Sequence, residues 1–66
     1  MNYYTAKMVA AKHGKKCIRD VEARRYYFEE RDGTPICDMS NDGLMGMTTA
    51  GLEERLGVRS KEDRHA

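Results

Sequence analysis

The sequence predicts a small α+β domain of element order α-β-β-β-α, in which one antiparallel sheet is flanked by two short helices. The strongest observation is the segment 24–38, which holds three of the five aromatic side chains and reads as two strands closed by a turn at Asp32-Gly33. Capped segments with helical spacing of apolar residues lie on both sides of this hairpin. A chain of 66 residues has room for one domain.

The first helix is expected to begin after Thr5, as its N-cap, and to run to about Lys12. His13 and Gly14 are expected to end it, because glycine readily adopts the left-handed conformation that follows a helix. The side chains expected to face the core are Met8, Val9 and either Ala10 or Ala11.

Residues 16–22 are expected to form the first strand. Strand alternation would place Cys17, Arg19 and Val21 on one face and Ile18, Asp20 and Glu22 on the other. A helix over residues 17–30 is the alternative, since Ile18, Val21, Arg25 and Phe28 also fall at helical spacing. The strand interpretation is favoured because the run Tyr26-Tyr27-Phe28 suits a strand and a strong turn signal follows it.

Alternation along the hairpin predicts that Tyr26 and Phe28 share one face, and that Tyr27 points to the other face beside Arg25. The second hairpin strand is expected at a sheet edge, because Pro35 lacks an N–H to donate to a neighbouring strand. That edge is therefore a candidate for strand addition by a partner or by a second copy.

Residues 40–43 are expected to form a turn, followed by an apolar segment at residues 44–47. The second helix is expected to begin at Thr48 or Thr49 and to end at Gly57, with Leu52 and Leu56 on its apolar face. Residues 1–58 would then form one compact domain, and residues 59–66 a mobile C-terminal tail without apolar anchors.

Composition restricts the classes of function. The net charge is +1, distributed as +3 over residues 1–33 and −2 over residues 34–66, which falls short of the excess expected of a dedicated nucleic-acid binder. The apolar runs are too short to span a membrane, and the start of the chain lacks the pattern of a secretory signal, so a cytoplasmic location with reduced thiols is expected.

No metal or cofactor site is expected. Residues 38–43 match the first half of a calcium-binding loop, but Thr49 stands where such loops carry a bidentate glutamate. Cys17 and Cys37 do not form a zinc motif with the two histidines, and small buried thiols on neighbouring strands are expected instead.

These patterns favour a non-enzymatic module that attaches to a larger protein and modulates or inhibits it. Small size and absence of motifs are typical of the accessory proteins of bacteriophages and mobile elements. A homodimer is expected, because so small a core supplies only about 3–5 kcal/mol. The residues expected to contact the partner are Arg24, Arg25, Tyr26, Tyr27, Leu44, Met45 and Met47.

The alternative is a protein that binds nucleic acid or a nucleotide through its basic N-terminal half. Lysine and arginine side chains neutralise phosphates, and exposed tyrosines stack on bases. The residues expected to bind the anion are Lys15, Lys16, Arg19 and Arg25.

Overall fold

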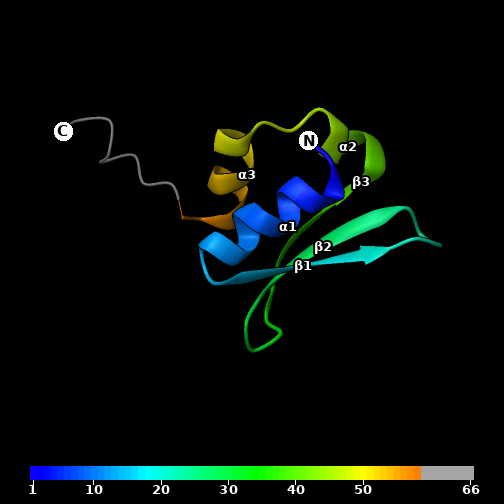
Figure 1. Cartoon of the computed structure of the whole chain (residues 1–66). Helices are drawn as coiled ribbons and strands as arrows, with labels where there is room; N and C mark the ends of the chain where they lie inside the picture. The colour runs from blue at the N-terminus through cyan, green and yellow to red at the C-terminus, as the bar shows by residue number, and fades with distance from the viewer. Residues whose placement is uncertain (59–66) are drawn as a thin grey trace.

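A computed structural model describes residues 1–58, and the predicted mobile tail lies outside these residues. The element order is α1 (Tyr3–Lys12), β1 (Lys15–Asp20), β2 (Arg25–Glu30), β3 (Pro35–Ser40), α2 (Asn41–Met45) and α3 (Thr49–Leu56). The strands form one antiparallel sheet of order β1-β2-β3, and the helices lie on one face of it (Figure 1). The predicted α+β fold is confirmed, with α2 as an additional short helix.

The strands bury one face and expose the other. Tyr26 and Phe28 on β2 are buried, whereas Tyr27 lies on the opposite, open face of the sheet. Phe28 is fully buried and pairs with Cys17 on one side and Cys37 on the other. The two cysteines therefore lie on the outer strands with β2 between them, so the expectation that they occupy neighbouring strands is wrong.

The predicted helix at the start of the chain is confirmed, but its N-cap and its inward face differ from the prediction. Asn2 rather than Thr5 caps α1, because its side chain accepts a hydrogen bond from the Thr5 N–H at 2.8 Å. Met8 is 73% exposed, and the inward face consists of Ala6, Val9 and Ala10. Small alanines allow α1 to lie close to β1, and this packing sets the helix orientation.

The first strand is shorter than predicted, since it ends at Asp20 and the chain turns through residues 21–24. Val21 is 71% exposed in this turn, and Arg24 has a positive φ of 56°. The alternative of a helix over residues 17–30 is wrong, because Tyr26 and Phe28 pair with both neighbouring strands.

The last helix follows its predicted caps. The Thr48 hydroxyl accepts a hydrogen bond from the Gly51 N–H at 3.0 Å, and Gly57 ends α3 with a φ of 75°. Leu52 and Leu56 are buried in the core, as predicted. The expected turn at residues 40–43 instead begins α2, because the Ser40 hydroxyl accepts a hydrogen bond from the Gly43 N–H at 3.1 Å.

Candidate functional site

A hollow of about 560 Å³ opens at the end of the sheet where β1 turns into β2. Its walls come from the start of α1, the end of β1, the start of β2, and α2. We call it the tyrosine hollow, after the principal lining residues Tyr3, Tyr4, Arg19, Tyr26, Asn41 and Met45. Side chains from four elements therefore converge on one concave surface, and binding sites are typically concave.

Aromatic contacts order the floor of the tyrosine hollow. The rings of Tyr3 and Tyr26 stack, with centroids 6.0 Å apart and an angle of 27° between their planes. The ring centroid of Tyr4 lies 5.4 Å from that of Tyr3. The Arg19 guanidinium lies 4.6 Å from the centre of the Tyr3 ring, within range of a cation–π interaction. The Tyr26 hydroxyl donates a hydrogen bond to Asn41 Oδ1 at 3.0 Å, so this buried phenol is satisfied.

The amino group of Met1 connects α1 to α2 beside the hollow. It donates hydrogen bonds to the backbone carbonyls of Leu44, Met45 and Met47 at 2.9, 3.0 and 3.1 Å. The carbonyls of Leu44 and Met45 lie at the C-terminal end of α2, where the helix dipole favours a positive charge, and that of Met47 lies just beyond the helix. The contacts hold together the two helices that form opposite walls of the tyrosine hollow.

The basic residues predicted to bind an anion do not form one site. Lys15 and Arg19 belong to the face covered by the helices, whereas Lys16 and Arg25 belong to the open face. Three of these four basic side chains form ion pairs. The nitrogen–oxygen distances are 2.7 Å for Lys15–Glu30, 3.8 Å for Lys16–Glu29 and 2.6 Å for Arg25–Asp38. Their positive charges are thus largely neutralised.

Two arginines near the hollow have no carboxylate partner within residues 1–58. Arg19 contacts the Tyr3 ring, and no ion pair from residues 1–58 reaches its guanidinium or that of Arg24. Arg24 lines an adjoining hollow that shares Arg19, Tyr26 and Asn41 with the tyrosine hollow. Asp20 is the single acidic residue that lines the two hollows, so this end of the molecule combines aromatic surface with a net positive charge.

The residues predicted to contact a partner separate into two groups. Tyr26, Leu44 and Met45 line the tyrosine hollow, and Arg24 lines the adjoining one. Of these, Tyr26 and Leu44 are buried, so they support the surface, whereas Met45 is 67% exposed at its rim.

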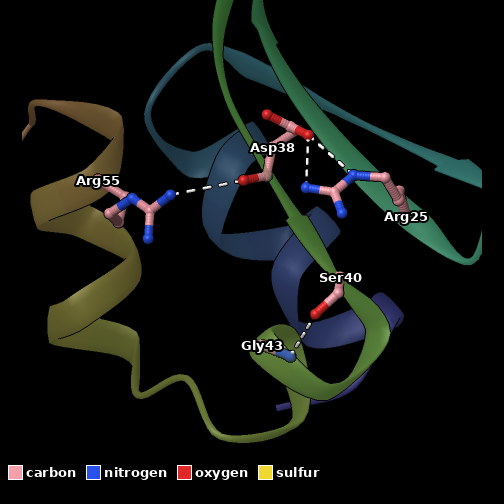
Figure 2. Close-up of polar contacts among 5 residues, drawn as sticks. All are labelled: Arg25, Asp38, Ser40, Gly43 and Arg55. Carbon is pink, nitrogen blue, oxygen red and sulfur yellow. Dashed lines mark hydrogen bonds and ion pairs between the residues drawn. The ribbon is translucent and has the colours of Figure 1, made fainter.

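The other members of the predicted set lie elsewhere. Arg25 and Tyr27 occupy the open face of the sheet, and Met47 is half-buried against the core. Figure 2 shows Arg25 directed at Asp38, to which its Nε donates a hydrogen bond at 2.9 Å. The predicted pair of Arg25 and Tyr27 is therefore separated from the tyrosine hollow by the sheet itself.

Sequence reasoning did not assign Tyr3, Tyr4 and Asn41 to a partner-binding surface. The available signal was a pair of tyrosines directly after Asn2, a residue type that caps helices well. A helix beginning there carries both rings on its first turn. Their approach to Arg19 and Tyr26, however, depends on how α1 crosses the sheet.

The thiols and histidine have structural surroundings. Burial raises the pKa of the Cys17 thiol to about 11, and burial also raises the pKa of Cys37, so both thiols are poor nucleophiles near neutral pH. His13 Nε2 lies 2.8 Å from Glu53 Oε2 and links α1 to α3. Within residues 1–58, no group of three or more histidine, cysteine or acidic side chains could hold a metal ion.

Comparison with known proteins finds no matching family model, no matching curated protein and no matching solved structure. Among the described helices, none combines the length and the apolar character that a membrane crossing requires.

Proposed function

We propose that this protein is a non-enzymatic binding module that attaches to a larger protein through the tyrosine hollow and thereby modulates or inhibits that partner. The observation that carries the proposal is the convergence of Tyr3, Tyr4 and Arg19 on one concave surface. Tyrosine and arginine are enriched among the residues that dominate protein–protein binding energy. The stacked rings lose little conformational freedom on binding, which favours affinity.

The chemistry of the hollow favours an acidic partner segment. Arg19 and Arg24 make no ion pair within the described chain and outnumber Asp20, the one acidic residue lining these hollows, so a carboxylate from the partner would meet a net positive surface. Met45, exposed at the rim, supplies a flexible apolar contact beside these charges. A partner segment with an acidic residue next to an apolar one would match both features.

Nucleic-acid or nucleotide binding is the second candidate, supported by the contact between Arg19 and the Tyr3 ring. Such pairs also stack on bases and approach phosphates. The neutralised lysines of β1 weaken this alternative. The two candidates differ in salt dependence, because phosphate binding weakens steeply as salt rises, whereas a largely apolar protein interface changes little.

Two expectations from the sequence complete the proposal. A small core of ten buried residues is compatible with the proposed homodimer, since domains of this size often gain stability by self-association. The two free thiols are compatible with the proposed cytoplasmic location.

The proposal is tested by using the intact protein as bait for affinity capture of partners from its native lysate, with and without nuclease. Substitutions at two methionines provide a matched comparison. Met45 and Met8 are similarly exposed, at 67% and 73%, but only Met45 lines the tyrosine hollow. Met45→Glu is expected to abolish capture of a protein partner, and Met8→Glu to preserve it. Equal effects of the two substitutions, or loss of capture after nuclease treatment, would contradict a protein-binding hollow. Circular dichroism of both variants confirms that each remains folded.

A further inference from the structure

The outer edge of β3 is partly occupied by other groups of the chain. The Asn41 N–H donates a hydrogen bond to the Arg24 carbonyl at 3.1 Å. Since alternate residues of an antiparallel strand bond to the same neighbour, the odd-numbered residues of β3 bond to β2, and the backbone groups of Asp38 point away from β2. Arg55 on α3 donates from Nη2 to this Asp38 carbonyl at 3.4 Å (Figure 2). Pro35 has no N–H to offer, and the register shifts beside it. The edge that the sequence marked for strand addition is thus less available at Pro35 and at the Asp38 carbonyl.

The outer edge of β1 is open by the same alternation. Residues of β2 with even numbers bond to β3, so Arg25, Tyr27 and Glu29 bond to β1. The N–H and C=O groups of Lys15, Cys17 and Arg19 therefore point outward. Within residues 1–58, no turn, loop or side-chain hydrogen bond reaches these outward groups. Unpaired edges of this kind readily accept another strand.

A groove of about 300 Å³ runs beside this open edge, between α1 and β1. Ala11, Cys17 and the 41%-exposed Ile18 form its apolar part. Lys7 supplies positive charge at its margin and has no ion pair among the described residues, whereas Lys16 is paired with Glu29. An extended segment lying here would meet apolar surface and cations together.

We propose that the β1 edge binds an extended acidic segment of a partner protein, which adds to the sheet as a fourth strand. Charge complementarity selects this occupant, because Lys7 beside the edge and Arg19 on β1 are cations without an ion pair among residues 1–58, and Asp20 is the single acidic residue of β1. A second copy of β1 would bring like charges together. The proposal is independent of the tyrosine hollow, although Arg19 borders both surfaces.

Hydrogen exchange on the intact protein tests the proposal with two blocked seven-residue peptides, one alternating valine with glutamate and one alternating valine with lysine. The glutamate peptide is expected to slow exchange at the outward amides of Cys17 and Arg19 by at least about tenfold. The amide of Ile18, which already faces β2, is expected to change little. Absence of binding, or binding that leaves Cys17 and Arg19 unprotected, would overturn the proposal.

Two lysines of α1 provide a matched pair for the charge requirement. Lys7 lines the groove, whereas the exposed Lys12 does not. Lys7→Glu is expected to lower the affinity for the glutamate peptide by up to about fivefold, whereas Lys12→Glu is expected to leave that affinity unchanged. If the lysine peptide binds with the same affinity as the glutamate peptide, the proposal of an acidic partner is overturned. If the outward amides become protected as the protein concentration rises without any peptide, the occupant is a second copy of the protein and the proposal is likewise overturned. Met45→Glu is expected to leave peptide binding intact, which separates this test from that of the tyrosine hollow.

Discussion

The thiol of Cys17 gives a quantitative test of the described core. Its side chain is 8% exposed between α1 and the sheet, and burial raises its pKa from 9.0 to about 11, against a smaller opposing effect of Lys7. At pH 8, the thiolate fraction of Cys17 is then lower in the folded protein than in the unfolded chain by about a hundredfold. Since the thiolate is the reactive form, alkylation should slow by at least that factor.

The assay is alkylation with iodoacetamide, with each cysteine followed by peptide mass spectrometry. Cys17 is expected to react about a hundredfold more slowly in buffer than in urea at the same pH. Cys37, which is half-buried on β3, serves as an internal comparison and is expected to react faster than Cys17 in the folded protein. Equal rates for Cys17 in buffer and in urea would refute its burial.

The same shift predicts the pH dependence of stability. The folded protein holds Cys17 as the neutral thiol, so this contribution to stability is complete below pH 9 and decreases as the pH rises towards about 11. The full shift corresponds to about 3 kcal/mol at about 1.4 kcal/mol per pH unit, and roughly 2 kcal/mol of it is lost between pH 9 and pH 11. Urea unfolding of Cys17→Ala is expected to show a correspondingly flatter profile above pH 9 than that of the parent protein. Parallel profiles would contradict the shift.

Two further matched pairs test the core and the helix ends by urea unfolding. Phe28→Leu is expected to lower the free energy of unfolding by about 1–2 kcal/mol, whereas Tyr27→Leu on the open face should change it by no more than about 0.5 kcal/mol; equal losses would contradict the assignment of faces. Gly57→Ala is expected to cost about 1 kcal/mol because Gly57 has a φ of 75°, whereas Gly46→Ala, at a φ of −88°, should cost nothing. A neutral Gly57→Ala would contradict the left-handed end of α3.

Local signals account for most of the predicted fold. The Asp32-Gly33 turn and the aromatic run before it specify the hairpin, because turn geometry and side-chain alternation involve residues close in the sequence. The same holds for Thr48 and Gly57, whose capping contacts reach only a few residues away. Asn2 caps α1 in place of the predicted Thr5. Both residue types cap helices well, so residue type alone did not distinguish them.

The inward face of α1 was predicted less well, since hydrophobicity alone favoured Met8. In the structure, α1 is oriented by close packing of Ala6 and Ala10, which contribute little hydrophobicity of their own. Met8 is left exposed because the face with small side chains allows the closer approach to β1. Such a preference depends on the shape of the opposing strand, which lies outside the helix sequence.

The sequence by itself determined the α+β class, the strand order along the chain, the separation of Tyr27 from Tyr26 and Phe28, and the ends of the last helix. Only the tertiary structure decided that Tyr3 and Arg19 meet, that Arg55 contacts the outer edge of β3, and that the outward backbone groups of β1 lack partners among residues 1–58. The physical reason is range. Turns and caps depend on hydrogen bonds between near neighbours, whereas surfaces and sheet edges depend on how separate elements pack against one another.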